Sequence, residues 1–163
     1  MHTEHLSDPY YHLAQVNIAR TLAPLEDPLM AEFVALLDEI NALADRSPGF
    51  IWRLQTESGN ATYIRPYEDD RIIVNLSVWE SVERLKEYVY HSAHSELIRG
   101  RSQWFEKFDG PYTALWWVEA GHIPTVEEAK ERLDHLRKHG ESEFAFSLKG
   151  VYAPQAHEST YSR

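Results

Sequence analysis

The chain of 163 residues contains no cysteine, which excludes disulfide bonds, thiolate metal ligands and a cysteine nucleophile. Long hydrophobic runs are also lacking, since no apolar stretch approaches the ~18 residues of a membrane-spanning helix. The N-terminus has no basic region followed by an apolar run, so no signal peptide is predicted. A cysteine-free chain of this kind suits the cytoplasm, and that is the location we expect.

Positive charge is scarce. Sixteen basic residues face 26 acidic ones, which gives a formal net charge of −10. Nucleic acids and anionic membranes are bound through basic surfaces, so we expect neither as a partner. The sequence also lacks a glycine-rich phosphate loop, a GxSxG elbow and a dinucleotide-binding fingerprint, which removes several common enzyme classes.

Aromatic residues are abundant, at 12% of the chain with five Trp and nine Tyr. They are explained either by core packing or by a flat apolar ligand pocket. The length fits one domain with its own core. We expect a loose polar arm over residues 1–9, a single domain over residues 10–152 and a polar tail over residues 153–163.

Hydrophobic periodicity predicts an alternation of strands and helices. Asp27 followed by Pro28 marks one helix start, and Thr125 with Glu128 forms a capping box at another. The predicted strands cover residues 10–18, 50–55, 71–79 and 112–119, with a short added strand within 144–151. The predicted helices cover residues 28–45, 82–90 with a second run over 92–108, and a C-terminal helix over 125–139.

The first strand has two chemically different faces. Ala14, Val16 and Ile18 point one way, whereas Gln15 and Asn17 point the other. Polar side chains on one face of a central strand indicate either contact with solvent or a cavity lined for hydrogen bonding.

The order β-α-β-β-α-β predicts an α+β, ferredoxin-like fold with a four-stranded antiparallel sheet, plus the extra C-terminal helix. Helices on one face leave the other face of the sheet uncovered. We expect that face to carry Trp79 and Ile73. An apolar face of this kind must be buried, so we predict a homodimer whose two sheets form one dimeric α/β barrel.

The helix after the third strand carries the candidate chemistry. By helical spacing, His94 shares a face with Arg101, and His91 precedes His94 by three residues. His94 is interpreted as a general base or an axial ligand, or else as a packed histidine. Arg101 clamps a carboxylate or forms a surface ion pair. No further ligand pattern completes a metal site around the two histidines, so no metal is predicted.

A substrate-binding set is predicted beside these two residues. Several tryptophans at the sheet would form a flat apolar surface, and a strand amide would add a polar point to it. The predicted substrate-binding residues are Trp52, Asn75, Trp79, His91 and Trp104.

The segment VNLSVWESVERLKEYVYHSAHSELIRGRSQWF resembles the DUF3291 family of short bacterial proteins, with the likeness strongest in NLSVWES and in the spaced His91, His94, Arg101 and Trp104. That family is similar to the dimeric α/β-barrel superfamily that includes the antibiotic-biosynthesis monooxygenases. The resemblance implies the fold and the dimer. It also implies that His94 matches the histidine that binds iron in heme-degrading relatives, with Asn17 or Asn75 in the place of their strand asparagine.

Three functions stay open at this point. The first is a cofactor-independent monooxygenase acting on an aromatic small molecule, with His94 assisting deprotonation. The second is a heme-binding protein or heme oxygenase-like enzyme with His94 as iron ligand. The third is a non-enzymatic binding or interaction domain whose aromatic residues form only a core.

Overall fold

The structure is a computed structural model and describes residues 10–55, 67–69, 71–90, 101–107 and 110–154, with the side chain of residue 101 left out. Four antiparallel strands form one sheet in the order β2-β3-β1-β4. They are β1 (Tyr11–Arg20), β2 (Phe50–Arg53), β3 (Ile72–Trp79) and β4 (Thr113–Glu119). This strand order and the succession of elements confirm the predicted ferredoxin-like α+β fold.

The helices follow in the predicted places. They are the 3₁₀ turn η2 (Pro28–Met30), α1 (Ala31–Asp45), α2 (Val82–Tyr90), α4 (Arg101–Trp104) and α5 (Val126–His139). The Asp27 side chain caps η2 by accepting from the Leu29 N–H, and Thr125 caps α5 by accepting from the Glu128 N–H, as the sequence predicts. No helix in the described ranges has both the length and the apolar character needed to cross a membrane.

The predicted second run over residues 92–108 is only partly described. Its residues 92–100 lie outside the described part of the chain, and α4 ends at Trp104 rather than at residue 108. Helical structure stops there because Phe105 forms an isolated antiparallel bridge with Thr21. The following residue, Glu106, pairs with Arg20 at the end of β1, and Arg20 also binds Asp69 at 2.5 Å.

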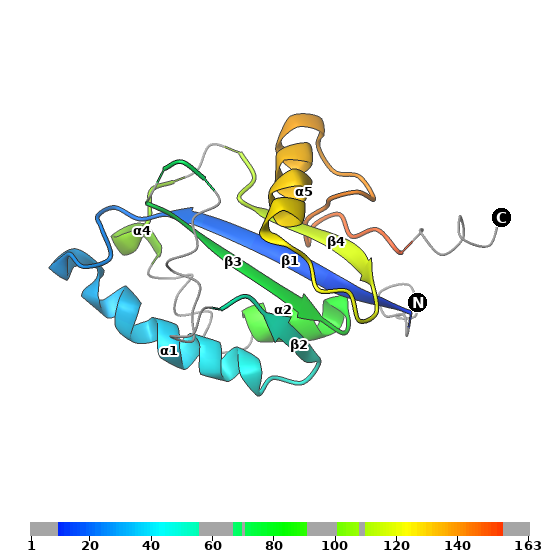
Figure 1. The fold of residues 1–163 in the computed structure, drawn as a ribbon, viewed down its shortest axis with the longest axis horizontal. Coiled ribbons are helices and arrows are strands. Elements are labelled where there is room, and N and C mark those ends of the chain that lie inside the picture. The colour runs from blue at the N-terminus through cyan, green and yellow to red at the C-terminus, as the bar shows by residue number, and fades with distance from the viewer. Residues whose placement is uncertain (1–9, 56–66, 70, 91–100, 108–109, 155–163) are drawn as a thin grey trace.

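The α5 helix packs on one face of the sheet, over β1 and β4. Its Ala129, Leu133 and Leu136 belong to the cluster formed by the even-numbered residues of β1 and their neighbours on β3 and β4, such as Val16 and Trp116. We call this side the α5 face. Figure 1 shows α5 over the β1–β4 part of the sheet at the top of the view, whereas α1 lies at the bottom, away from α5.

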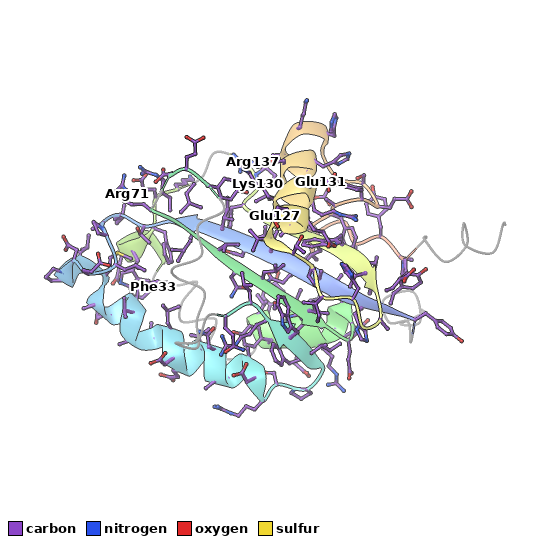
Figure 2. All side chains as sticks on the ribbon, in the orientation of Figure 1. Phe33, Arg71, Glu127, Lys130, Glu131 and Arg137 are labelled. Atoms are coloured by element: carbon purple, nitrogen blue, oxygen red, sulfur yellow. The ribbon has the colours of Figure 1, made fainter. Side chains whose placement is uncertain are left out.

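The opposite face, which we call the helix face, carries the odd-numbered residues of β1. Leu13 and Trp79 pack there against Val82 and Leu85 of α2. At the other end of this face Ile73 packs against the cluster of α1, η2 and α4 residues. Phe33 of α1 lies toward α4 in Figure 2, with its ring centroid 5.9 Å from that of Trp104.

The expectation that Trp79 and Ile73 lie on an uncovered face is wrong. Trp79 is only 1% exposed, because α2 packs over it. The opposite face is covered by α5, and the half-buried Tyr67 adds to its cluster. The homodimer predicted from the sequence therefore stays a prediction, without the exposed apolar face from which it was inferred.

The predicted short strand within residues 144–151 is reduced to a single bridge. Phe146 exchanges two backbone hydrogen bonds with Leu115 of β4, at 2.7 and 2.9 Å. The chain turns away directly afterwards, because both the backbone N–H and the hydroxyl of Ser147 bind the carboxylate of Glu141.

Candidate functional site

A band of polar side chains crosses the middle of the helix face. The register of the sheet creates it, because Gln15 lies opposite Ser77 and Asn17 lies opposite Asn75 and Thr113. Residues opposite each other on neighbouring strands point to the same face, so all five side chains share one surface. We call Gln15, Asn17, Asn75, Ser77 and Thr113 the polar band.

Hydrogen bonds connect the members of the polar band. Gln15 Nε2 donates to Asn75 Oδ1 at 2.6 Å and to Ser77 Oγ at 2.9 Å. Asn17 Nδ2 donates to Thr113 Oγ1 at 3.0 Å. The indole N–H of Trp79 donates to Ser77 Oγ at 2.9 Å, which fixes the orientation of this ring beside the band.

Apolar clusters flank the polar band at both ends. On one side lie Leu13 and Trp79, with the Trp79 ring 5.4 Å from Phe50 and 5.0 Å from Tyr88 between centroids. On the other side lies Trp104, which packs with the rings of α1 and its neighbourhood. Trp79 and Trp104 are both buried, so the polar band lies between two packed aromatic clusters.

Asn75 is the exposed member of the polar band. It sits within β3, an inner strand of the sheet, and its neighbours along the strand, Val74 and Leu76, are buried on the α5 face. Gln15 and Ser77 are buried, whereas Asn17 is half-buried. The band therefore has a buried side that holds it in place and an accessible side at Asn75 and Asn17.

Two contacts fasten the C-terminal half of α1 beside this site. Arg53 of β2 is buried and binds the carboxylate of Asp45 through two nitrogens, at 2.8 and 3.3 Å. Tyr88 of α2 donates its hydroxyl to the Ile40 carbonyl at 3.3 Å. Burial raises the pKa of the Tyr88 phenol, an effect that Arg53 opposes and Asp45 reinforces, so Tyr88 stays protonated and acts as a donor.

The structure brings together part of the predicted substrate-binding set. Asn75 lies in the polar band, and Trp79 and Trp104 lie in the apolar clusters at its two ends. Trp52 is placed elsewhere, because it lies opposite Val78 and packs against the cluster of the α5 face. The fold therefore does not bring Trp52 to the same side of the sheet as the other three residues.

His91 and His94 lie outside the described residues, as does the side chain of Arg101. Their predicted roles stay predictions. Among the described residues no group of three or more His, Cys, Asp or Glu could hold a metal ion.

Four histidines lie in the part of the chain that the structure describes. His12 lies opposite Val118 and so on the α5 face, His122 follows β4, and His135 and His139 belong to α5. None of these four imidazoles is on the helix face. The described residues of that face thus include no imidazole, and His94, the iron ligand implied by the family resemblance, lies outside them.

Sequence reasoning missed three parts of the site. Ser77 and Thr113 read as ordinary strand residues, and Arg53 gave no sign of being buried. The alternation of polar and apolar residues in the first strand did indicate Gln15 and Asn17. The partners across the strands were not predictable, because the register depends on contacts between distant segments.

The order of strands, the helix face and its polar band define a ferredoxin-like α/β protein with a candidate small-molecule site. The chain belongs to the family described as "Domain of unknown function (DUF3291)", whose model matches residues 12–162. No curated protein matches the chain.

Several solved structures are similar at low identity. SnoaB, a cofactor-independent oxygenase from Streptomyces nogalater, is 15% identical, with a TM-score of 0.44, and the match covers 71% of this chain and 96% of that one. A conserved protein from Methanosarcina mazei Go1 is 15% identical, with a TM-score of 0.48 and coverage of 67% and 92%. A protein of unknown function from Nitrosomonas europaea is 11% identical, with a TM-score of 0.46 and coverage of 71% and 97%. At such identities the activities of these proteins do not transfer to this chain.

Proposed function

We propose that this protein binds a flat aromatic small molecule on the polar band and oxidises it as a cofactor-independent monooxygenase. The observation that carries the proposal is the exposure of Asn75 at the centre of the helix face, between two aromatic clusters. Only the oxygen of this amide accepts a hydrogen bond from Gln15, and the side chain is otherwise exposed within an inner strand. It is well placed to orient a ligand.

The chemistry that suits such a site is carried by the substrate. His94 removes a proton from an acidic phenol or an activated CH₂ group, and the resulting anion transfers electrons to O₂. A C–O bond forms, and loss of water leaves a carbonyl, so that CH₂ and O₂ become C=O and H₂O. The substrate supplies all the electrons. The protein orients the anion through Asn75, excludes water with Trp79 and Trp104, and contacts an acidic group through Arg101.

Oxygen uptake with anthrone as substrate tests this proposal. We expect turnover that His94→Ala lowers by at least about a hundredfold, the usual contribution of a general base. Asn75→Ala should weaken substrate binding, whereas Trp52→Phe, on the other face of the sheet, should change neither quantity. Binding of anthrone without oxygen uptake would contradict the enzymatic activity and indicate a binding protein. Turnover unchanged in His94→Ala would contradict the role of this histidine.

We also propose that the protein acts as a homodimer, on the strength of the family resemblance in its sequence. Because α5 and Tyr67 cover the α5 face, two sheets could pair through that face only if α5 moved away. The proposal therefore favours a different contact surface. Light scattering at low micromolar concentration tests this proposal, and a measured mass of only 19.0 kDa, that of one chain, would contradict the homodimer.

A further inference from the structure

The carboxamide of Gln15 occupies a central position in the hydrogen bonds beneath the proposed site. It is buried, and its single nitrogen donates both to Asn75 Oδ1 and to Ser77 Oγ. Both of its N–H bonds are therefore used on neighbouring β3 residues. Ser77 Oγ accepts a second hydrogen bond from Trp79. Gln15 thus connects the exposed amide of Asn75 to the buried hydroxyl of Ser77, which also holds the Trp79 indole.

These bonds determine which end of the Asn75 amide meets a ligand. Its oxygen is held by Gln15 at 2.6 Å, so the amide nitrogen is left as the outward group. An amide nitrogen carries only donors. Asn75, the exposed member of the polar band, therefore presents N–H groups and recognises an oxygen acceptor such as a ketone or a phenolate.

We propose that Gln15 is a positioning residue that sets the hydrogen-bond polarity of the site, so that ligands with an oxygen acceptor are preferred over ligands with a donor at the same position. This inference rests on the proposed binding of flat aromatic molecules. It goes beyond that proposal because it assigns the preference to a buried residue that a ligand at Asn75 does not need to touch.

Three tricyclic probes of nearly the same shape test the preference. Fluorenone presents a carbonyl oxygen, carbazole presents an N–H donor, and fluorene presents neither. Isothermal titration of the full-length protein at pH 8 should show fluorenone binding roughly fivefold tighter than fluorene, the effect of about one net hydrogen bond. Carbazole should bind no better than fluorene.

Two substitutions then separate the contribution of Gln15 from that of the pocket shape. Gln15→Met keeps the length of the side chain and removes both donors. Fluorenone should then bind this variant about as tightly as fluorene does. Gln15→Glu offers only acceptors when ionised and should turn the Asn75 nitrogen inward, so that carbazole becomes the preferred probe. Gln103→Met makes the same chemical change at an exposed position of α4 and should leave the ratio unchanged.

A measurement without ligand tests the network itself. In the wild-type protein the slowly exchanging side-chain amide should belong to Gln15 and not to Asn75, as identified by sequence-specific NMR assignment of the wild type. This readout needs no variant, so it decides the orientation even if Gln15→Met or Gln15→Glu fails to fold.

The outcomes distinguish the two proposals. If the ratio of fluorenone to carbazole affinity were the same in the wild type, Gln15→Met and Gln15→Glu, the role of Gln15 would be overturned. The proposed aromatic site would not be affected by that result. Failure of all three probes to bind the wild type would overturn the aromatic site, and a slowly exchanging amide at Asn75 would overturn the orientation.

Discussion

The indole nitrogen of Trp116 donates a hydrogen bond to Glu128 Oε2 at 2.8 Å, which joins the middle of β4 to the first turn of α5. The second oxygen of the same carboxylate lies 2.8 Å from His122 Nε2. Burial would raise the pKa of Glu128, but the hydrogen bonds from His122 and Trp116 outweigh it and hold the pKa below the ordinary value of 4.5. The carboxylate is therefore part of what keeps α5 on the sheet.

Glu128→Gln should destabilise the protein at pH 7 by about 1–2 kcal/mol, because a charge-assisted hydrogen bond is replaced by a neutral one. A depressed folded-state pKa contributes stability above the unfolded value of 4.5, and this contribution is lost as pH falls through the folded pKa. Urea unfolding between pH 3 and 7 should therefore show a weaker pH dependence in the variant. Glu131→Gln, at an exposed position of the same helix, should behave like the wild type. Equal pH dependence in both variants would contradict this.

Gly49 and Gly121 provide a matched pair for backbone strain. Both have φ in the left-handed region, at +83° and +95°. A Cβ atom at Gly49 would lie 2.3 Å from Arg84 Cγ of α2, whereas nothing lies within 4 Å at Gly121. Gly121→Ala should cost about 1–2 kcal/mol of unfolding free energy from backbone strain alone. Gly49→Ala should cost about 2–4 kcal/mol, because α2 must also shift. Similar values by chemical denaturation would show that α2 is free to move.

Asp45→Ala tests the attachment of α1 to the sheet. The side chain of Arg53 is 9% exposed, so removal of the carboxylate takes a charge partner from a buried guanidinium. Asp45 itself is 46% exposed, which reduces the loss to about 1–3 kcal/mol. Glu87→Ala breaks the Arg84–Glu87 pair of α2, in which both side chains are exposed, and should cost no more than about 0.5 kcal/mol. Thermal unfolding of both variants gives the comparison, and equal losses would refute it.

Ser77 and Trp79 should be energetically coupled. In the wild type, Ser77→Ala leaves the buried indole N–H without its acceptor and should cost about 1–3 kcal/mol. In a Trp79→Phe background the same change should cost about 1 kcal/mol less, because no indole donor is present. A double-mutant cycle by urea unfolding measures the difference. A coupling energy near zero would mean that the 2.9 Å contact does not orient the ring.

Hemin titration separates the proposed oxygenase from the heme interpretation of the sequence. We expect no Soret shift on addition of hemin, because the proposed oxygenase works without a cofactor. A shift that is present in the wild type and absent in His94→Ala would establish the heme interpretation. A shift that persists in His94→Ala but disappears in His91→Ala would move the ligand to the other histidine.

Much of the fold was predictable because local signals agreed with each other. The alternation within β1, the cap at Asp27 and the capping box at Thr125 each fix an element with residues close in sequence. The βαββαβ order then leaves few topologies. The same local patterns placed Gln15 and Asn17 on one face, which is the basis of the polar band.

The role of α5 was not predictable from its sequence. Its apolar stripe consists of Ala129, Leu133 and Leu136, which is narrow for a helix that packs over β1 and β4. The other contacts come from residues that read as surface positions, since the guanidinium of Arg132 stacks on Phe144 at 3.9 Å. Long polar side chains bury their apolar parts in this way without leaving a hydrophobic signal. The expectation of an uncovered face came from the ferredoxin-like topology alone, which does not include an additional helix such as α5.

The bridge between Leu115 and Phe146 decides how the sheet can meet other chains. β4 is an outer strand, and its middle is already paired by the protein's own C-terminal segment. The other outer strand, β2, has only four residues, and Arg53 at its end is held by Asp45. Within the described residues, neither border of the sheet offers a long unpaired backbone, a feature that opposes growth by strand addition, the route by which sheets seed fibrils.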